Sequence, residues 1–498
     1  MPDTVTLQNW IAGKPAAPHS NAWLERHNPA DTRELVARVP ASGANDADAA
    51  LAAAAAAYPA WRATPAPRRA EILFRAAQLL VERKEAYAAT MTREMGKVLE
   101  ETRGDVQEAI DMLYFMAGEG RRLYGQTTPS ELANKMCMTM RVPLGVAALI
   151  TPWNFPMAIP SWKLAPCLLC GNTAVLKPAE DTPLSAMNLV TALTDAGLPP
   201  GVVNVVFGRG GVVGPALVGD ERPRIVSFTG STAVGKQVGQ IAAAGLKHCN
   251  LEMGGKNAII ILDDADLQLA LEGCLWAAFG TSGQRCTAAS RIVVQKGMLK
   301  KFLEAFQERA AALTVGPGLV AASQVGPVVN ARQRDRIEEY IAIGKKEGAR
   351  LALGGGRVTT EACAHGYFLQ PTIFAGVERG MRIAQEEIFG PVVSVIACDD
   401  LEDAIAINNG VRYGLSSSLY TANVNAAFRA LRDLDSGIVY VNAPTIGAEV
   451  HLPFGGVRAT GNGHRESGQA TLEVYSEWKT LYVDYSGRLQ RAQIDTGE

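Results

Sequence analysis

Hydrophobic residues recur every three or four positions through the first quarter of the chain. In the stretch 71–81, Ile, Leu, Phe and Val alternate with Glu, Arg and Gln at the spacing that gives an α-helix one apolar face. Pro65 and Pro67 interrupt the pattern, and Asp46 is a plausible N-terminal cap for an earlier helix. The pattern therefore predicts helices over 44–118.

Beyond Arg141 the pattern changes to short apolar runs, bounded by Gly or Pro and separated by segments of helical length. The runs lie at 145–150, 173–176, 202–206, 224–228 and 258–262. Such runs are typical of buried strands in a parallel sheet with helical crossovers. A second alternating series, from about Ala289 through Ile396 to Val441, predicts another α/β lobe. A cleft between two lobes is where ligands usually bind.

The stretch 475–483 alternates apolar and polar residues in the manner of an exposed strand. An edge strand with apolar side chains often pairs with another subunit. We therefore expect a homodimer or a homotetramer.

Composition narrows the function classes. The 498 residues are 48% hydrophobic and carry a net charge of −2, so two or three domains are expected and nucleic acid or an anionic membrane is not favoured as a partner. The longest apolar stretches, 49–57 and 258–262, are far shorter than the roughly 20 residues that cross a bilayer. Residues 1–10 show no secretory signal pattern. These features predict a cytoplasmic protein that binds a small molecule.

The eight cysteines are too scattered to suggest a disulfide framework. Cys167 and Cys170 form a C-x-x-C, but no second Cys or His pair completes a zinc site, so no metal is expected. Cys286 differs because it lies beside Arg285 in the polar, glycine-rich stretch 279–291. It is either a buried structural cysteine or an exposed nucleophile whose thiolate Arg285 stabilises.

Two further segments carry candidate chemistry. The turn 228–235 (FTGSTAVG) follows an apolar run and precedes a helical stretch, so its backbone N–H groups could hold a phosphate, although a plain tight loop fits too. The glycine-rich stretch 208–214 is interpreted as a connection. Glu252 precedes two glycines and an apolar strand. It is a solvated turn residue or, beside a cysteine nucleophile, the base that activates water.

Together these segments resemble the aldehyde dehydrogenase superfamily over nearly the whole chain, in order and in spacing. Four further motifs match, at 151–156, 177–180, 386–391 and 453–456. The resemblance implies an α/β fold with three parts. They are a Rossmann-like NAD-binding domain (1–123 and 143–253), an α/β catalytic domain (254–454) and a small β extension for oligomerisation (124–142 and 470–489).

The resemblance also implies NAD-dependent oxidation of an aldehyde to a carboxylic acid. Cys286 would attack the aldehyde, and the Asn154 amide with the Cys286 N–H would hold the oxyanion. After hydride transfer to the nicotinamide, water activated by Glu252 would hydrolyse the thioester. Lys163 and Glu466 match positions associated with proton transfer behind Glu252, and a surface ion pair is the alternative for both.

For the cofactor, seven residues match family positions: Trp153, Lys177, Glu180, Gly230, Ser231, Glu387 and Phe389. Lys177 and Glu180 match contacts to the adenosine ribose, and Ser231 matches a pyrophosphate contact. Glu387 and Phe389 match the nicotinamide-ribose side. The Glu180 carboxylate would repel the 2′-phosphate of NADP, so NAD is favoured while NADP use stays open.

Substrate choice rests on less diagnostic positions: Glu108, Arg285, Ala448 and Phe454. The stretches 285–287 and 447–449 look similar to branches that act on α-ketoglutaric, succinic or aminoadipic semialdehyde, whose distant carboxylate Arg285 or loop amides could bind. The chain departs from the family at Met253, where Leu is usual. It also departs at 461–466, a segment one residue longer than the common family pattern, with His464 as the extra residue. His464 is either a proton carrier or a surface residue.

Three rival interpretations stay open. A CoA-acylating dehydrogenase would need no hydrolytic base, so Glu252 speaks against it. A cysteine hydrolase would need a His partner, and none of the six histidines lies in a recognisable base motif. A catalytically silent binding homologue would have no need to keep Cys286, Asn154 and Glu252.

Overall fold

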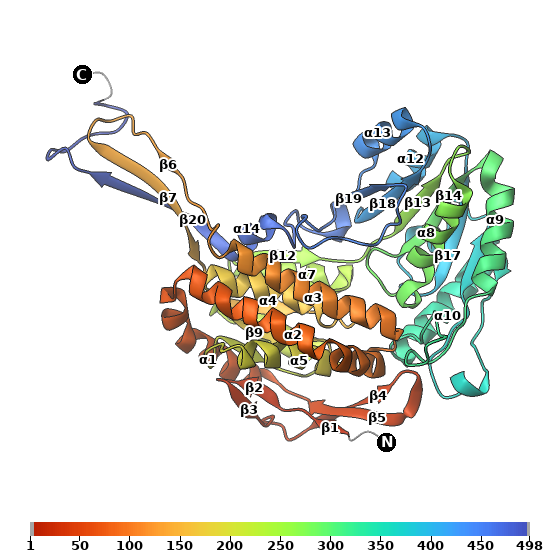
Figure 1. The fold of residues 1–498 in the computed structure, drawn as a ribbon, viewed down its shortest axis with the longest axis horizontal. Helices are drawn as coiled ribbons and strands as arrows, with labels where there is room; N and C mark the ends of the chain where they lie inside the picture. The colour runs from red at the N-terminus through yellow and green to blue at the C-terminus, as the bar shows by residue number, and fades with distance from the viewer. Residues whose placement is uncertain (1–3, 496–498) are drawn as a thin grey trace.

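The computed structural model describes residues 4–495, so the first residues of the N-terminal stretch 1–10 lie outside it. Two lobes stand side by side, and a long arm projects from the first lobe (Figure 1). Each lobe is built on a seven-stranded sheet covered by helices. The predicted α/β fold with a small β extension is therefore confirmed. No helix in the described range is long and apolar enough to span a membrane.

The sheet of the first lobe has the strand order β12-β11-β8-β9-β10-β2-β3. Its bounds are β2 (Asn9–Ile11), β3 (Lys14–Ala16), β8 (Val146–Ile150), β9 (Thr173–Lys177), β10 (Val203–Val205), β11 (Pro223–Thr229) and β12 (His248–Glu252). Strands β8 to β12 are parallel, and β2 and β3 add an antiparallel edge. Four of the predicted runs are strands here. Strand β12 was not predicted, and Glu252 is its last residue.

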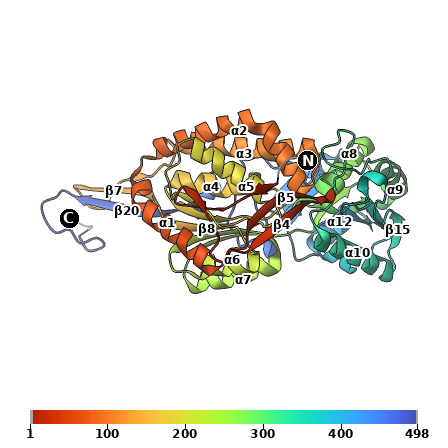
Figure 2. The same cartoon turned by 90° about the horizontal axis from the view of Figure 1, so that it is seen from below.

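Helices cover both faces of this sheet (Figure 2). One face carries α1 (Ala44–Ala63), α6 (Gly210–Gly219) and α7 (Thr232–Ala244), and the other carries α2 (Ala66–Met95), α3 (Leu99–Glu119), α4 (Ala158–Cys170) and α5 (Pro183–Asp195). The prediction of helices over 44–118 is confirmed. Asp46 is not the N-cap of α1, however: Gly43 is, and the Asp46 carboxylate accepts a hydrogen bond from the Gly43 N–H.

The second lobe has the strand order β15-β16-β17-β14-β13-β18-β19, with β15 the antiparallel edge. Its strands are β13 (Asn257–Ile261), β14 (Ala289–Gln295), β15 (Arg350–Leu353), β16 (Thr372–Ala375), β17 (Val392–Cys398), β18 (Ser416–Tyr420) and β19 (Ile438–Val441). Its helices are α8 (Leu267–Phe279), α9 (Lys296–Ala311), α10 (Ala331–Lys346), α11 (Arg382–Gln385), α12 (Leu401–Asn409) and α13 (Val424–Asp433). One apolar cluster packs α8 and α9 on the sheet, and another packs α10, α12 and α13 on it.

Two smaller sheets complete the fold. An N-terminal sheet consists of β1 (Val5–Thr6), β4 (Trp23–Asn28) and β5 (Asp31–Pro40). The arm consists of β6 (Thr127–Thr128), β7 (Lys135–Pro143) and β20 (Ser476–Asp484), and the short helix α14 (Leu472–Tyr475) leads into it. Strand β20 pairs with β7 along its whole length, which agrees with the strand predicted over 475–483.

Candidate active site

The segment that leads to Cys286 has a strained backbone. Helix α8 ends at Phe279, and in the one-turn helix η1 (Gly280–Gly283) Thr281 and Ser282 have φ values of 52° and 55°. Non-glycine residues in this left-handed region cost about 1–3 kcal/mol each. Gly283 follows with φ 68°, and a Cβ there would lie 2.1 Å from the Gly390 carbonyl oxygen. Only glycine fits at that position.

Polar contacts hold this strained segment on several sides. The Ser282 hydroxyl donates to the Gly326 carbonyl (2.6 Å), and the Gln284 side-chain oxygen accepts the Val329 N–H (3.0 Å). The Thr281 N–H donates to the Glu101 carboxylate at 2.6 Å. The loop before α10 and helix α3 of the other lobe therefore hold the segment that leads to Cys286.

Cys286 is partly buried and its thiol is not pre-ionised. Burial, followed by the nearby carboxylates of Glu387 and Glu252, raises the pKa of the thiol to about 12. The expectation that Arg285 stabilises the thiolate is wrong, because the Arg285 guanidinium turns to Glu101 instead. The thiol therefore needs a base to remove its proton.

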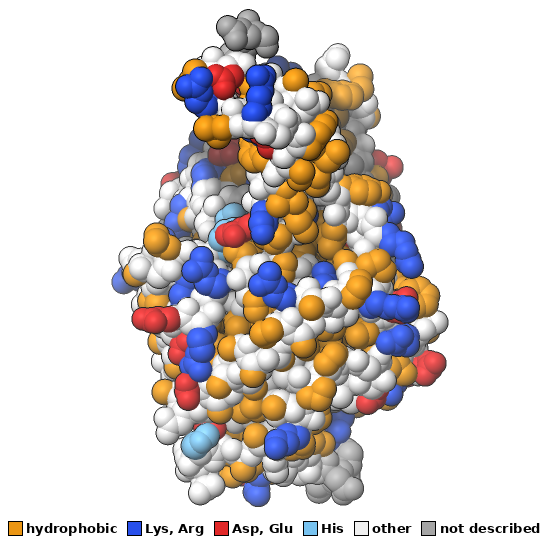
Figure 3. All heavy atoms as spheres, turned by 90° about the vertical axis from the view of Figure 1, so that its left-hand side faces the viewer, with side chains coloured by type: hydrophobic (Ala, Val, Ile, Leu, Met, Phe, Trp, Pro, Cys, Tyr) orange, Lys and Arg blue, Asp and Glu red, His pale blue; other side chains and the backbone are white. Residues whose placement is uncertain are grey.

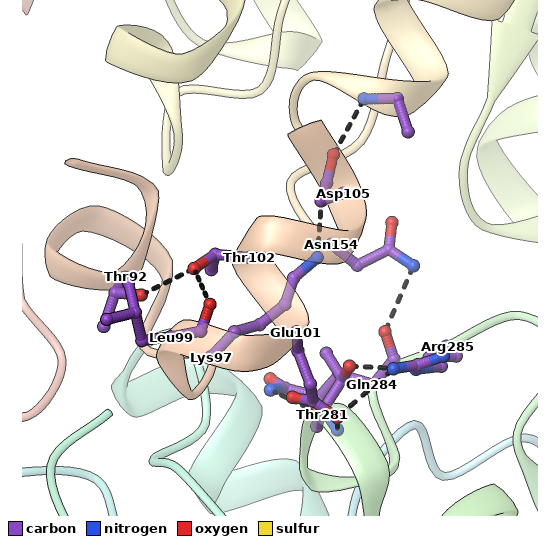
Figure 4. Close-up of polar contacts among 11 residues, drawn as sticks. Thr92, Lys97, Leu99, Glu101, Thr102, Asp105, Asn154, Thr281, Gln284 and Arg285 are labelled. Carbon is purple, nitrogen blue, oxygen red and sulfur yellow. Dashed lines mark hydrogen bonds and ion pairs between the residues drawn. The ribbon is translucent and has the colours of Figure 1, made fainter. Parts of the chain in front are cut away.

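Asn154 lies between β8 and α4, buried at 3% exposure, and approaches the nucleophile segment from the first lobe. Its side-chain amide donates to the Gln284 carbonyl at 3.1 Å, two residues before Cys286 (Figure 4). An amide in this place can donate to a developing oxyanion without exchanging protons.

Glu252 ends β12 on the cleft side of the first sheet. It is 3% exposed, and within residues 4–495 neither carboxylate oxygen has a hydrogen-bond partner. Burial and the neighbouring Glu466 carboxylate raise the pKa of Glu252 well above its usual range. The interpretation as a solvated turn residue is therefore wrong, and the group has the character of a proton acceptor held in a dry site.

A buried ion pair lies behind Glu252. Lys163 on α4 and Glu466 are both enclosed, and the ammonium contacts one Glu466 oxygen directly. Asn250 donates to that same oxygen at 3.0 Å. The alternative of a surface ion pair for Lys163 and Glu466 is thus wrong. His464 is exposed on the neighbouring loop, where partial burial and His248 lower its pKa, and it forms no hydrogen bond or ion pair with Lys163 or Glu466 in the described structure.

A cavity of about 520 Å³ opens on one side of Cys286 between the lobes. Its lining includes every cofactor residue predicted from the sequence: Trp153, Lys177, Glu180, Gly230, Ser231, Glu387 and Phe389. Cys286 and Asn154 line the same cavity. The cavity thus joins the nucleophile to the turn at Gly230.

The residues of this cavity fit a dinucleotide. Ser231 caps α7, whose first N–H groups face the cavity, and a Cβ at Gly235 would lie 2.4 Å from the Met253 sulfur, so the backbone is closely packed there. Lys177 and Glu180 form an ion pair at 3.1 Å at the other end. Burial opposes ionisation of Glu180, but Lys177 and the nearby Gly210 backbone lower its pKa, so the stretch 208–214 begins helix α6 beside the site and is more than a connection.

Glu387 and Phe389 line the cavity from the second lobe, and the Glu387 carboxylate acts on the Cys286 thiol. The Glu387 carboxylate accepts the Gly255 N–H at 3.1 Å, and burial raises its pKa. Phe389 has φ 62° and meets Trp153 edge to face, with the ring centroids 5.3 Å apart. These rings narrow the cavity beside Cys286.

A second cavity, of about 760 Å³, lies on the α3 side of the nucleophile segment and is lined by Glu108, Arg285, Phe155 and Trp276. The guanidinium carbon of Arg285 lies 5.4 Å from the Phe155 ring centroid and 5.9 Å from that of Trp276. Ala448 and Phe454, also predicted to contact substrate, do not line this cavity. Phe454 is buried and packs edge to face on Trp162.

Sequence reasoning missed the polar support of this second cavity, which comes from α3 (Figure 4). Lys97 and Asp105 form a fully buried ion pair at 2.6 Å, and Asp105 also accepts the Ala158 N–H at the start of α4. Glu101 contacts both Thr281 and Arg285. The only signal in the sequence is the acidic spacing of 101, 105 and 108, which resembles an ordinary helix surface.

The fold and the site define a two-lobed oxidoreductase in which a cysteine lies at the end of a dinucleotide cleft, with an amide and a buried carboxylate beside it. A profile of the aldehyde dehydrogenase family matches residues 16–481. The chain belongs to the aldehyde dehydrogenase family. The prediction of an NAD(P)-dependent aldehyde oxidoreductase is thereby confirmed.

Individual relatives match this chain along nearly their whole lengths. An alpha-ketoglutaric semialdehyde dehydrogenase of Bacillus subtilis is 41% identical, with 96% of this chain and 98% of that protein covered. An alpha-ketoglutarate semialdehyde dehydrogenase of Haloferax volcanii is 42% identical, with 96% and 99% covered. The crystal structure of a Staphylococcus aureus betaine aldehyde dehydrogenase in complex with NAD+ superimposes with a TM-score of 0.95 at 33% identity, covering 97% of this chain and 96% of that chain.

Proposed function

We propose that this enzyme oxidises an aldehyde carrying a distant carboxylate, of the α-ketoglutaric semialdehyde type, to the corresponding acid with NAD as oxidant. The observation that carries the proposal is that Cys286 lines one cavity while its neighbour in the chain, Arg285, lines a second. One cavity fits a dinucleotide, and the other presents a guanidinium, Arg285, next to the nucleophile. The Bacillus subtilis and Haloferax volcanii relatives support this substrate class.

The first step is addition of the Cys286 sulfur to the aldehyde carbon. The Asn154 amide and the Cys286 N–H donate to the oxygen as it gains negative charge, which stabilises the tetrahedral adduct. Glu252, with free oxygens and a raised pKa, is the group that takes the thiol proton. The Asn154 amide already points at the nucleophile segment, so little reorganisation is needed.

A nicotinamide coenzyme bound in the 520 Å³ cavity would supply the hydride acceptor, and the adduct on Cys286 would become a thioester. Lys177 and Glu180 would hold the adenosine ribose, the α7 N-terminus the pyrophosphate, and Glu387 the second ribose. The Glu180 carboxylate disfavours a 2′-phosphate, which supports NAD over NADP.

Hydrolysis of the thioester completes the reaction. Glu252 removes a proton from water as the water attacks the thioester carbon, and the Cys286 sulfur departs. Lys163 and Glu466 lie behind Glu252 and offer the proton a path away from the site. Because the base is present and buried, a water molecule rather than coenzyme A is the proposed acceptor of the acyl group.

Charge in the second cavity supports a carboxylated substrate. Arg285 can donate two parallel hydrogen bonds to a carboxylate. Burial, followed by the Asp105 carboxylate, raises the pKa of Glu108 to about 8. At neutral pH Glu108 is therefore protonated, so it does not repel a carboxylate and can donate a hydrogen bond to it.

A direct comparison of two aldehydes of equal length tests the proposal. Absorbance of reduced coenzyme would give kcat/KM for 2,5-dioxopentanoate and for pentanal, each with NAD and with NADP. We expect the carboxylated aldehyde with NAD to be turned over best. Faster turnover of pentanal would contradict the substrate class. A CoA thioester product in the presence of coenzyme A would contradict hydrolysis.

We further propose that the arm assembles the enzyme into a homodimer or homotetramer. Hydrophobic side chains gather along the arm (Figure 3), and they include the exposed Met136, Met140, Trp478, Tyr482 and Val483. Exposed apolar side chains on an edge strand are typical of subunit contacts. The division into 1–123 with 143–253, 254–454, and the arm segments 124–142 and 470–489 remains part of the same proposal. Sedimentation analysis of an arm variant, Trp478→Glu with Tyr482→Glu, tests the assembly.

A further inference from the structure

The nucleophile segment depends on a carboxylate from the other lobe. Thr281 and Ser282 have φ values in the left-handed region. An extended or right-handed helical backbone would remove this strain. The Thr281 N–H in this strained turn donates to Glu101 Oε1 at 2.6 Å. Glu101 lies on α3, 180 residues away in the sequence, and its side chain is 12% exposed. A charged acceptor shielded from water gives this backbone hydrogen bond more strength than a neutral one.

The same carboxylate oxygen also fixes Arg285. The Arg285 guanidinium donates to Glu101 Oε1 at 3.2 Å and, through Nε, to the Thr281 hydroxyl at 2.9 Å (Figure 4). Phe155 and Trp276 flank the guanidinium on its remaining sides. Glu101 thus determines where the Arg285 cation lies and how much of its charge is neutralised.

We propose that Glu101 is a positioning residue with two functions: it holds the strained turn that aims Cys286, and it orients and partly neutralises Arg285 at the wall of the substrate cavity. The second function rests on the proposed carboxylated substrate. The first function does not depend on that substrate, because the position of Cys286 matters for the oxidation of any aldehyde.

The neighbouring acidic residues of α3 have different surroundings. Asp105 is committed to Lys97 and to the Ala158 N–H. Glu100 lines the same cavity but is exposed and makes no hydrogen bond in the described structure. Glu100→Gln is therefore a matched control, since it removes one negative charge from the same helix turn without touching the nucleophile segment.

Two substitutions separate the functions of Glu101. Glu101→Ala removes the acceptor for Thr281 and the partner of Arg285. Glu101→Gln keeps a carbonyl oxygen for Thr281 but removes the charge beside Arg285. Each variant, with Glu100→Gln, is assayed with butanal and with succinic semialdehyde, which differ by the carboxylate. Thermal midpoint and NAD binding by fluorescence report whether each variant folds.

We expect Glu101→Ala to lower kcat at least 10-fold on both aldehydes while NAD binding stays within two-fold. Glu101→Gln should recover most of that loss on butanal. It should also lower the KM for succinic semialdehyde at least three-fold relative to butanal, because Arg285 is less neutralised. Glu100→Gln should shift this KM ratio by less than two-fold.

Wild-type kcat on butanal in Glu101→Ala would overturn the first function. An unchanged KM ratio in Glu101→Gln, or an equal shift in Glu100→Gln, would overturn the second. If Glu101→Ala fails to fold, kcat of Glu101→Gln on butanal tests the first function. A kcat close to wild type is expected, because the amide oxygen still accepts the Thr281 N–H. A loss above 10-fold with normal NAD binding would overturn this function. A wild-type enzyme that prefers butanal would refute the carboxylated substrate while leaving the kcat test intact.

Discussion

The two cavities, one lined by Cys286 and the other by its neighbour Arg285, are built in different ways. The first-lobe wall of the dinucleotide cavity is formed by local features, namely the turn at Gly230, the α7 N-terminus and the ends of parallel strands, and the second lobe adds residues such as Glu387 and Phe389. The substrate cavity is formed by side chains of α3 that reach across to the nucleophile segment of the second lobe. Most of the residues expected to hold the coenzyme therefore belong to short segments that can be recognised in the sequence, whereas the polar contacts of the substrate cavity form only when α3 and the nucleophile segment come together.

Removal of the sulfur should abolish the function of both cavities together. Cys286→Ala is expected to lower kcat by about 10⁴-fold or more, because no other group in the cleft can form the thioester. NAD binding should persist, since the coenzyme contacts lie elsewhere. Stopped-flow detection of reduced coenzyme measures the first turnover, and a normal first turnover in Cys286→Ala would contradict the proposed nucleophile.

Loss of the Asn154 amide should weaken stabilisation of the oxyanion that forms beside Cys286. Asn154→Ala is expected to lower kcat by about 10²–10³-fold, the usual effect of losing one oxyanion donor. KM for the aldehyde should change little, because the interaction forms mainly in the transition state. Steady-state kinetics measures both values, and a rise in KM with normal kcat would show that Asn154 acts in ground-state binding instead.

Substitution of one residue from each cavity tests whether the two cavities bind substrate and coenzyme separately. Arg285→Gln should raise KM for a carboxylated aldehyde by about 10- to 100-fold, because a charged hydrogen bond of about 1.5–3 kcal/mol is lost. It should leave KM for NAD unchanged. Glu180→Gln is the matched variant on the coenzyme side, and it should shift the NAD/NADP preference without altering KM for the aldehyde. An equal rise in KM for pentanal in Arg285→Gln would contradict a contact between Arg285 and the substrate carboxylate.

The smallest expected effect is a pH dependence confined to the substrate cavity. Because the pKa of Glu108 is raised to about 8, this group is neutral at pH 7 and becomes negative as the pH rises through 8. KM for a carboxylated aldehyde should therefore increase several-fold between pH 7 and 9, while KM for a plain aldehyde should not follow it. In Glu108→Gln this increase in KM with pH should disappear. If KM for the carboxylated aldehyde still rises with pH in that variant, another group causes the effect.

Sequence patterns predicted most of the fold and the coenzyme side of the site. Parallel strands such as β8 and β9 are continuous apolar runs, and the phosphate turn has local signals in its glycines and its capping serine. Strand β12 was missed because His248 and Asn250 interrupt its apolar character. The roles of Glu101 and Asp105 could not be read from the sequence, since their partners Thr281 and Ala158 become neighbours only after folding.

The burial of Lys163 and Glu466 was equally invisible. Both residue types are usually exposed, and only the approach of α4 to the segment after Phe454 encloses them. The low exposure of Glu252 has the same origin, because the Gly461 backbone pairs with it. Charged groups in dry surroundings are therefore the part of this site that requires a structure.

The central claim is that a thioester on Cys286 is hydrolysed by water that Glu252 activates. Glu252→Gln leaves the sulfur and the coenzyme cavity in place. It slows the addition step, because Glu252 also takes the thiol proton, but it blocks hydrolysis, so the acyl group should accumulate on Cys286 during a long incubation. After incubation with NAD and the carboxylated aldehyde, mass spectrometry should find the acyl group attached to the peptide that contains Cys286. Normal turnover with no acyl adduct in this variant would contradict the account.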